Sequence, residues 1–257
     1  AKAVTSAAAS PPTTVRRAAE TAASVGRLLA PATEPLSDVM TARSLSVRFD
    51  VLRYPLADLK AAAKVAGGKL NDAFVAGVAG GFRRYHLRHG SSVKALRMTM
   101  PINIRNEATA DLAGNQFAPA RSPVPIDIDD PVARMQAVHE LAGQARGEPA
   151  LDLAEPLAAI LYRLPTTIST GVFGSMLRGV DFVTSNVPGV PVPVFLAGAR
   201  MEAQFPFGPM TGAATNITLL SYLDEVQIGV NTDPAAIPDG DVFLTCLDEG
   251  FAEVLKV

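Results

Sequence analysis

Apolar and polar residues alternate between Ser44 and Leu52. The apolar positions are Leu45, Val47, Phe49 and Val51, and the polar residues between them are Ser46, Arg48 and Asp50. A period of two predicts a strand with one buried face. Near the other end of the chain, apolar residues recur at helical spacing between Asp239 and Leu255, which predicts an amphipathic helix capped by Asp239.

The rest of the pattern predicts strands interspersed with helices. The expected helices cover 14–29, 55–65, 71–87, a segment that begins at Asp130-Pro131, and two parts of 151–180 divided at Pro165. The expected strands cover 96–104, 180–184, 194–204, 213–222 and 226–231, with 117–128 extended and a tight hairpin at 223–225. This order predicts a layered α/β (α+β) domain, a mixed β-sheet flanked by helices, over residues 43–257. Residues 1–42 are predicted to form an N-terminal linker and helix.

The helix predicted at 71–87 is rich in small residues. These are Ala76, Gly77, Ala79, Gly80 and Gly81. Each glycine costs up to roughly 1 kcal/mol of helix propensity relative to alanine. The pattern therefore predicts that another helix or a sheet approaches this helix closely.

The amino-acid composition limits which classes of protein the chain can belong to. With 48% hydrophobic and 19% charged residues, the 257-residue chain has enough apolar material for a sizeable core. The net charge of −2, with no basic stripe, argues against a nucleic-acid partner. The single cysteine, Cys246, is predicted to be a buried small hydrophobe and suits a reducing cytosol. Residues 1–14 lack the pattern of a signal peptide, and no uncharged apolar run is long enough to span a bilayer, so a cytoplasmic location is expected.

The histidines and acidic clusters do not predict a metal site. His86 and His89 fall at the C-terminal end of a predicted helix, where they would complement the helix dipole. Two histidines at this spacing fall short of a zinc ligand set. His139 is expected at the surface of its helix. The Asp127, Asp129 and Asp130 cluster lacks the glycine and the later glutamate of a calcium loop, so helix capping by Asp130 is expected instead.

The segment 183–189 places polar side chains at the end of a strand. A β-branched stretch ends at Thr184, Ser185 and Asn186, and Pro188-Gly189 then turns the chain. One interpretation is that Ser185 and Asn186 only bond the turn backbone. The other is that one of these side chains faces a reaction cleft, and strand alternation decides which.

Several short stretches, taken in order, resemble one enzyme family. They are Pro55 to Lys60, Leu70 to Gly77, Pro101 to Arg105, Gly114 to Phe117, Thr184 to Gly189, and Ala213 to Ile217 with Ser221-Tyr222, Asp233 and Pro238-Asp239. Their order and spacing are similar to bacterial wax ester synthase/diacylglycerol acyltransferases, within the acyl-CoA-dependent acyltransferases that carry an H-H-x-x-x-D-G motif. The resemblance spans residues 43–257 and implies a chloramphenicol-acetyltransferase-like domain.

The family's catalytic motif is absent from this chain. Neither His86, His89 nor His139 has an adjacent histidine followed by Asp-Gly. The resemblance therefore implies a C-terminal half, with the catalytic histidine supplied by an N-terminal half that is a separate chain or a removed segment. It implies transfer of a long acyl group from acyl-CoA, the co-substrate, to diacylglycerol or a fatty alcohol. No other cofactor, no metal and no covalent acyl-enzyme are implied.

The resemblance also implies roles for individual residues. Ser185, in an S-x-x-P setting, is expected to hydrogen-bond the oxyanion, and such a donor is worth about 2.7–4 kcal/mol in the transition state. Thr184 and Asn186 are the alternatives. Asn71 and Asp72 match an Asn-Asp motif that would shape or polarise the active site between the halves. Their structural interpretation is that Asn71 caps a helix and Asp72 is a favourable charge in its first turn.

Substrate contacts are expected at Arg105, Asn115, Pro188 and Gly189. Arg105 would bind a CoA phosphate or bridge to the other half, or be a plain surface arginine. The apolar segment 157–177 would line an acyl tunnel, touch a membrane surface, or form ordinary core helices.

Three further interpretations stay open at this level. The loop 204–211 would cover the cleft or merely connect two strands. The resemblance leaves room for contact with a membrane's inner face or a lipid droplet. The alternatives to the acyltransferase are a non-catalytic lipid-binding or scaffold protein of the same fold, and a condensation or polyketide-type acyltransferase.

Overall fold

The computed structural model describes residues 16, 20–21, 23–26, 34–44, 46–103, 117–147, 163, 165–167 and 179–257. Its strands are β1 (Arg48–Pro55), β2 (Ala95–Asn103), β3 (Phe117–Pro125), β4 (Phe182–Val187), β5 (Phe195–Leu196), β6 (Ala199–Arg200), β7 (Thr215–Tyr222) and β8 (Glu225–Thr232). Its helices are α2 (Leu56–Val65), α3 (Leu70–Arg88), α4 (Pro131–Arg146) and α7 (Gly240–Val254). The described residues between 16 and 26 are also helical, in agreement with the helix predicted at 14–29.

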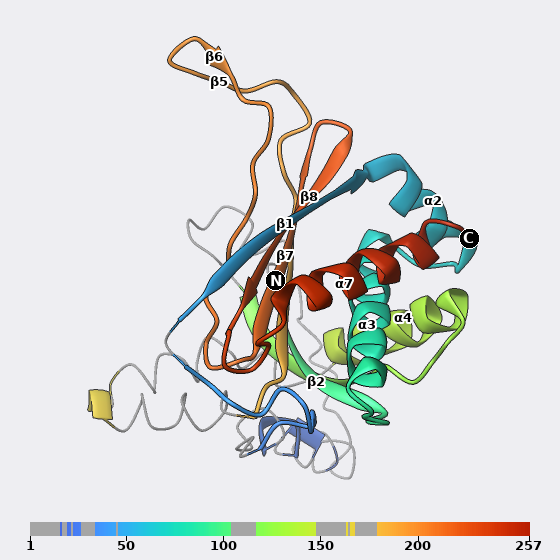
Figure 1. Cartoon of the computed structure of the whole chain (residues 1–257), viewed down its shortest axis with the longest axis vertical. Coiled ribbons are helices and arrows are strands. Elements are labelled where there is room, and N and C mark those ends of the chain that lie inside the picture. The colour runs from blue at the N-terminus through green and yellow to red at the C-terminus, as the bar shows by residue number, and fades with distance from the viewer. Residues whose placement is uncertain are drawn as a thin grey trace, which may run out of the picture.

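Six of the strands form one mixed sheet in the order β1-β8-β7-β4-β2-β3. The pairs β1–β8, β7–β8 and β2–β3 are antiparallel, whereas β4 runs parallel to both β2 and β7. Figure 1 shows α2, α3, α4 and α7 together on one side of this sheet. The predicted mixed sheet flanked by helices is therefore confirmed. The division at residue 42 stays a prediction.

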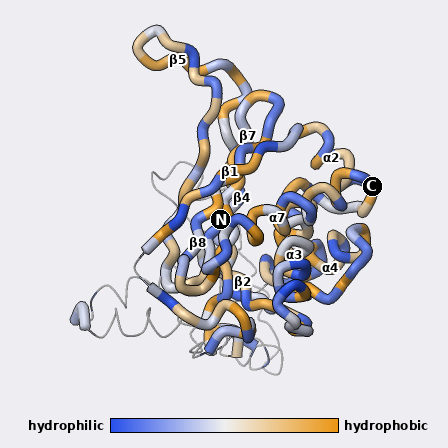
Figure 2. The backbone as a smooth tube through the Cα atoms, viewed as in Figure 1, coloured by the Kyte–Doolittle hydropathy of each residue, from blue (hydrophilic) through white to orange (hydrophobic). Residues whose placement is uncertain are grey.

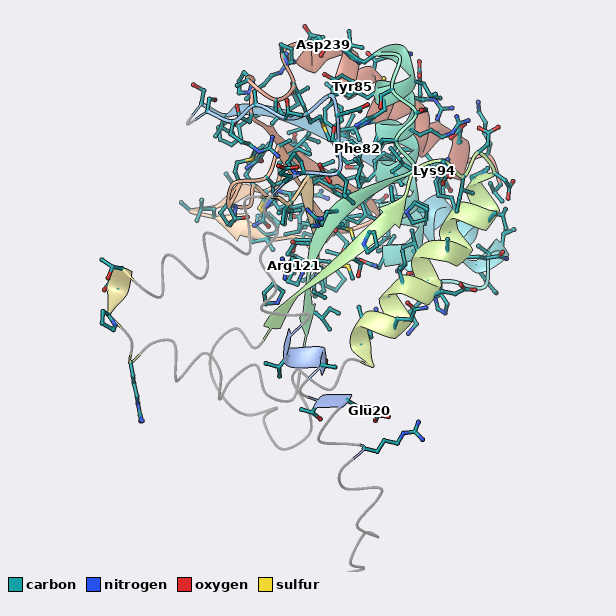
Figure 3. All side chains as sticks on the ribbon, turned by 90° about the horizontal axis from the view of Figure 1, so that it is seen from below. Glu20, Phe82, Tyr85, Lys94, Arg121 and Asp239 are labelled. Atoms are coloured by element: carbon teal, nitrogen blue, oxygen red, sulfur yellow. The ribbon has the colours of Figure 1, made fainter. Side chains whose placement is uncertain are left out.

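The core lies between the sheet and the helical layer. Phe82 of α3 contacts Phe182 of β4 and Phe243 of α7, with ring centroids 4.6 and 5.3 Å apart. Figure 3 shows Phe82 in this layer, with Tyr85 and Asp239 together toward one end. Cys246 is buried among these residues, as predicted, and burial raises the pKa of its thiol.

Helices α3 and α7 approach each other closely through glycines, as the small-residue pattern predicted. A Cβ on Gly81 would lie 2.7 Å from the Cα of Leu247. A Cβ on Gly250 would overlap the carbonyl of Gly77 and the amide of Gly81. Backbone therefore meets backbone at this crossing, and a larger residue at Gly250 has no room.

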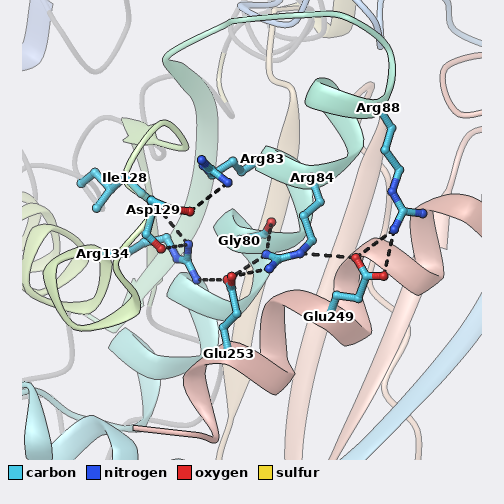
Figure 4. A network of polar contacts seen from close by, with 9 residues as sticks. All are labelled: Gly80, Arg83, Arg84, Arg88, Ile128, Asp129, Arg134, Glu249 and Glu253. Atoms are coloured by element: carbon cyan, nitrogen blue, oxygen red, sulfur yellow. Dashed lines mark hydrogen bonds and ion pairs between the residues drawn. The ribbon is translucent and has the colours of Figure 1, made fainter.

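An ion-pair network that includes a fully buried arginine ties α3, α4 and α7 together (Figure 4). Glu253 of α7 accepts hydrogen bonds from Arg84 of α3 and from Arg134 of α4, the latter at 2.9 Å. Arg134 is fully buried and also donates to the carbonyl of Ile128 at 3.1 Å. Burial lowers the pKa of this guanidinium, and Glu253 opposes that effect.

The prediction of a single strand over 194–204 is wrong. The chain instead forms a two-residue hairpin, β5–β6, that projects from the body as an arm (Figure 1). Ala197 and Gly198 reverse the chain with φ of 48° and 87°. Two successive positive φ values fit the tight turns that match strand twist. The turn consists of Ala197-Gly198 within an otherwise continuous apolar stretch, so the segment was interpreted as one strand.

Side chains of the sheet hold the base of the arm. The hydroxyl of Tyr222 accepts from the amide of Val194 at 3.1 Å and donates to the carbonyl of Met201 at 2.8 Å. Farther out, Phe195 and Leu196 are 62% and 79% exposed, and Figure 2 shows the hydrophobic colour at this tip. The arm therefore has a fixed base and an uncovered apolar end.

The segment 34–44 is bound to one end of the sheet. Asp181, fully buried before β4, accepts from the amides of Leu36, Ser37 and Arg97 at 2.7–3.1 Å. Asp233 accepts from the amide and hydroxyl of Ser44.

None of the described helices combines the length and apolar composition needed to cross a bilayer.

Candidate functional site

The register of β4 decides where its polar residues point. Thr184 pairs with Ile217 of β7, which belongs to the core under the helices, and Thr184 is itself buried. Its hydroxyl donates to the Met98 sulfur at 3.1 Å. Ser185 pairs with Thr218 and therefore faces the other side of the sheet, which carries none of the described helices and which we call the helix-free face. Asn186 pairs with the core residue Leu219 and points to the helix side at the strand end.

Ser185 is half-buried in a row of residues across the helix-free face. Its neighbour Thr218 is paired in turn with Gly229 of β8, and Gly229 with Val51 of β1. Among the described residues, no hydrogen bond engages the Ser185 hydroxyl. Its proton is therefore available to a substrate oxygen at this face.

Residues 204–209, which we call the strap, lie over β7 and β8 on the same helix-free face (Figure 1). Asn231 donates to the carbonyl of Gly208 at 2.6 Å, and Asn216 donates to that of Pro209 at 2.8 Å. Gln227 accepts from the amide of Gln204 at 2.5 Å. The strap does more than connect two strands, because three side chains of the sheet bind its backbone.

Glycines allow the strap and the turn after β4 to lie close to the sheet. A Cβ on Gly229 would overlap the carbonyl of Pro206. A Cβ on Gly189 would overlap the carbonyl of Ser221, whose hydroxyl accepts from the Gly189 amide at 3.2 Å. Pro188 and Gly189 thus lead away from Ser185 along β7, which gives Gly189 a structural reason beside its predicted substrate contact.

The Asn-Asp pair lies on the other side of the sheet, in the first turn of α3. The expected N-cap at Asn71 is wrong, because the helix begins at Leu70 and Lys69 is its N-cap. Asp72 is the residue that closes this end, since its carboxylate accepts from the Lys69 amide at 2.8 Å. The structure therefore does not bring Asn71 and Asp72 to the face that carries Ser185.

Asp72 has a second partner, His139 of α4. The two side chains lie 2.8 Å apart, with the carboxylate buried and the imidazole 46% exposed. His139 is thus partly at the surface, as expected, but it also links α4 to the start of α3. The Asp72 carboxylate is therefore engaged by two groups, the His139 imidazole and the Lys69 amide at the start of α3.

Asn71 borders a small apolar cavity of about 10 Å³ between α3, α4, β2 and β3. Its amide nitrogen lies 3.6 Å from the Met100 sulfur. Met98 and Ser122 also line the cavity. This volume is about the size of one water molecule and does not accommodate an acyl chain as it stands.

His86 lies in the last turn of α3 and bonds a carbonyl of that helix, as expected of a polar partner of the helix end, but it is buried. The imidazole is 1% exposed, with Nδ1 2.8 Å from the Phe82 carbonyl and Nε2 2.8 Å from the Ser37 hydroxyl. Because Nδ1 faces a carbonyl, we assign the ring proton to Nδ1, and the Ser37 hydroxyl then donates to Nε2. Burial lowers the pKa of His86 and favours this neutral form.

His89 also has local partners. Its Nδ1 lies 2.8 Å from the Tyr85 carbonyl and its Nε2 3.2 Å from Asp239, which accepts from the Tyr85 hydroxyl. Asp239 is at the N-cap of α7, as predicted, but its carboxylate bonds α3 rather than the α7 backbone. All three histidines therefore belong to helices on the side of the sheet opposite Ser185.

The described residues contain no cluster of three or more metal-ligating side chains. Asp130 caps α4 as predicted, since it accepts from the Ala133 amide at 2.7 Å, with Pro131 in the first turn. Asp129 pairs instead with Arg83 at 3.0 Å.

Arg105 and Asn115 lie outside the described residues, as does all of 157–177 except residues 163 and 165–167. Sequence reasoning missed Asp181 and Thr99, both buried polar residues. Thr99 lies on β2 beside Val183, and its hydroxyl has no partner among the described residues. The sequence signal for a buried Asp181 was its position inside the otherwise apolar run 180–183.

The fold defines the class of protein. The chain matches a wax ester synthase/diacylglycerol acyltransferase from Marinobacter aquaeolei VT8 with a TM-score of 0.63 and 24% identity, over 95% of this chain and 57% of that one. It matches a condensation domain of the enacyloxin polyketide synthase with a TM-score of 0.61 and 16% identity, over 96% of this chain and 48% of that one. At these identities the likeness shows a shared chloramphenicol-acetyltransferase-like fold.

Sequence comparison identifies the family within this class. The WS/DGAT C-terminal domain model matches residues 113–255, and the chain belongs to that family. A Mycobacterium tuberculosis H37Rv protein named as a candidate diacylglycerol O-acyltransferase, Rv2484c, is 38% identical over 231 residues, which cover 90% of this chain and 46% of the relative. A second such protein, Rv3087, is 32% identical over 76% of this chain and 43% of its own length. The chain thus spans about half the length of the curated relatives it matches.

Proposed function

We propose that this chain is the C-terminal half of an O-acyltransferase that moves a long acyl group from acyl-CoA to diacylglycerol or a fatty alcohol. Membership of the WS/DGAT C-terminal domain family supports the class of reaction. The names of the curated relatives support diacylglycerol as acceptor, and that of the similar Marinobacter protein supports a fatty alcohol as well. The half-length match supports a second half that completes the enzyme.

One observation supports the assignment of the oxyanion donor to this chain and of the general base to the other half. The hydroxyl of Ser185 faces the helix-free side of the sheet, while His86, His89 and His139 belong to the helices on the opposite side. Each of these histidines also has partners within the described part of the chain. A general base next to Ser185 would therefore come from the N-terminal half, in an H-H-x-x-x-D-G motif.

The proposed reaction needs no intermediate on the enzyme. The histidine of the other half takes the proton of the acceptor hydroxyl as its oxygen attacks the thioester carbonyl. Ser185 donates a hydrogen bond to the tetrahedral oxyanion. Collapse breaks the carbon–sulfur bond, and the imidazolium returns the proton to the departing CoA thiolate.

Two exposed apolar surfaces of this chain are proposed to contact the N-terminal half. Val47, which directly precedes the edge strand β1, forms an exposed apolar stripe with Phe49 and Val51 of β1, and Phe49 is 59% exposed. The arm presents Phe195 and Leu196. Edge strands and apolar patches of this kind are normally covered in a finished protein.

The remaining proposals concern the residues that contact substrates and the location of the enzyme in the cell. Arg105, Asn115, Pro188 and Gly189 are proposed to contact acyl-CoA or the acceptor. A peripheral position at a membrane's inner face or at a lipid droplet would give access to acceptors that partition into lipid.

The test is Ser185→Ala in the enzyme assembled from this chain and a half that bears H-H-x-x-x-D-G. We expect kcat for acyl transfer from acyl-CoA to fall about 100- to 1,000-fold, because one oxyanion donor is lost. Folding should be retained, since no described group bonds the Ser185 hydroxyl.

Thr184→Val is the matched control, because it removes the next hydroxyl on the opposite face and leaves Ser185 in place. Its kcat should stay near that of the wild type. Unchanged turnover in Ser185→Ala would remove Ser185 from the oxyanion role. If the assembled protein binds acyl-CoA but transfers no acyl group, the non-catalytic lipid-binding alternative is the correct one.

A further inference from the structure

Thr99 places a buried hydroxyl on the helix-free face. The small cavity beside α4 is lined by Met98 and Met100 of β2 and by Ala120 and Ser122 of β3, so the residues between them point to the other face. Thr99 is 6% exposed, and its hydroxyl has no hydrogen-bond partner among the described residues. Buried hydroxyls are normally paired, so this one indicates a ligand atom at this position.

Two arginines flank Thr99 on the same face. Arg121 is its register partner on β3, and Arg97 lies two residues before it on β2. Figure 3 shows Arg121 on the opposite side of this strand pair from α4. Burial and, second, the charge of Arg97 lower the pKa of Arg121, so the two guanidiniums are close enough to repel each other. A bound anion would offset this repulsion.

Arg97 is held in place by the backbone around it. Its Nη1 donates to the carbonyls of Glu34 and Gly179, both at 2.6 Å. Asp181, the acid next to this end of β4, is fully buried and accepts from three amides, one of them that of Arg97. Both guanidiniums stay charged at neutral pH. The face around Thr99 therefore combines a hydroxyl donor with two fixed positive charges.

The spacing from Ser185 fits the CoA part of acyl-CoA. Thr99 lies beside Val183 on β4, two residues before Ser185. Strand geometry places the Cα of Ser185 about 8 Å from that of Thr99 and about 12 Å from that of Arg121. In extended pantetheine, the first amide carbonyl lies about 6 Å from the thioester carbonyl and the phosphate about 16 Å from the sulfur. An extended arginine side chain reaches the remaining distance.

We propose that the helix-free face of β4, β2 and β3 binds the CoA part of acyl-CoA in an extended form, with Thr99 on the pantetheine arm and Arg121 and Arg97 on the phosphate at its end. This proposal rests on the proposed function, because it places the acyl donor whose thioester Ser185 contacts. The Thr99 hydroxyl donates to the amide carbonyl nearest the sulfur. Because Arg121 lies directly across from Thr99, its movement toward the phosphate uncovers that hydroxyl.

The binding experiment uses the assembled protein and needs no catalysis. Isothermal titration calorimetry gives the Kd of CoA, phosphopantetheine and pantetheine. The variants are Arg121→Gln, Thr99→Val and Thr99→Ser. Arg146→Gln is the control for charge, because Arg146 is exposed at the end of α4. Ser122→Ala is the control for the hydroxyl, because Ser122 lies on the helix side of β3.

The proposal predicts a different pattern for each residue. Arg121→Gln should raise the Kd of CoA and of phosphopantetheine about tenfold and leave that of pantetheine unchanged, because only the bond to phosphate is lost. Thr99→Val should raise all three about three- to tenfold, because each ligand carries the amide. Thr99→Ser and both controls should match the wild type. In the assembled enzyme, Arg121→Gln and Thr99→Val should raise KM for acyl-CoA more than they lower kcat.

Four outcomes would overturn the proposal. If both Arg121→Gln and Thr99→Val keep the wild-type Kd for CoA, this face does not bind CoA. If Arg121→Gln weakens pantetheine as much as CoA, its guanidinium does not contact the phosphate. If Thr99→Ser loses as much affinity as Thr99→Val, the hydroxyl is not the contact. If Arg121→Gln keeps CoA affinity but loses sedimentation with phosphatidylcholine vesicles that contain phosphatidate, the face binds a lipid phosphate instead.

Failure of the proposed function is seen separately. An assembled wild-type protein that shows the predicted binding pattern but transfers no acyl group would overturn the acyltransferase and keep the CoA-binding face. An active enzyme with unchanged CoA affinity in both variants would do the reverse.

Discussion

Individual side chains in this protein take their chemical character from which face of an element they occupy. Thr184 and Ser185 are consecutive hydroxyl residues, yet one bonds a core methionine sulfur and the other faces the helix-free side. His86 and His139 lie in helices of the same layer, yet one is buried and neutral while the other pairs with Asp72. Residue type alone would assign both members of each pair the same role.

His86 should make the stability of the chain depend on pH. Burial depresses its pKa below the ordinary value of about 6.5, so the neutral form is favoured by folding. The stability from this effect is fully present above the unfolded pKa and is lost as pH falls toward the folded pKa. The urea midpoint of the wild type should therefore drop between about pH 7.5 and about pH 5.

The matched variant is His86→Gln, which removes the titrating ring and keeps a polar side chain. It should be less stable than the wild type near neutral pH, because Ser37 and the Phe82 carbonyl lose their fitted partner. Its midpoint should also fall less on acidification. Parallel pH profiles for the two proteins would show that His86 does not couple protonation to folding.

Secondary-structure elements pack here through the absence of side chains as much as through their presence. The α3–α7 crossing depends on Gly77, Gly81 and Gly250, where backbones come into direct contact. The apolar rings of Phe82 and Phe243 fill the space beside it. The low helix propensity of these glycines is offset by the close contact they permit.

Gly250→Ala is expected to lower the free energy of unfolding by about 1–3 kcal/mol, because the added methyl overlaps the α3 backbone. Urea denaturation measures the change. Gly143→Ala in α4 is the control, since a Cβ there meets nothing within 4 Å. That variant should gain about 0.5–1 kcal/mol from better helix propensity. Equal losses in both would exclude the close crossing as the cause.

Much of the architecture was predictable at the element scale because the signals are local. The glycine-rich pattern of α3, the Asp130-Pro131 start of α4 and the hairpin between β7 and β8 all lie where the sequence predicts them. The arm was not predictable, since its two strands are only two residues long and the whole segment was interpreted as one strand. The N-cap of α3 was also misplaced, because Asp72 reaches back to close the helix end.

At the scale of the whole sheet, the described residues cover its two faces differently. The described helices α2, α3, α4 and α7 lie on one side, while the strap binds β7 and β8 on the other. Phe207 of the strap contacts Phe49 of β1, with ring centroids 5.0 Å apart, and the described residues leave the apolar stripe partly exposed. The arm projects past the ends of the sheet strands, and the apolar side chains at its tip are largely exposed (Figure 1). These features support the proposal that a second half completes the fold.

The arm provides a test at this scale. Phe195→Ser with Leu196→Ser should leave the free energy of unfolding of this chain within about 0.5 kcal/mol, because both side chains are largely exposed. The same pair of changes should lower the yield of the H-H-x-x-x-D-G half that co-purifies with this chain.

Val65→Ser is the matched control, since Val65 is 61% exposed but lies at the end of α2, away from the arm. Its co-purification should equal that of the wild type. Full recovery of the partner half by the arm variant would exclude the arm from the interface.

The sequence by itself determined the family, the mixed α/β class, most element positions and the absence of the paired-histidine motif, because these depend on residue order and short-range periodicity. Only the tertiary structure decided that Ser185 faces the helix-free side, that Asp72 serves α3 and His139, and that His86 is neutral in the core. Periodicity separates two faces of a strand or helix, but which face is covered depends on elements far away in the chain. The environment of a side chain, and with it its chemistry, is set by that covering.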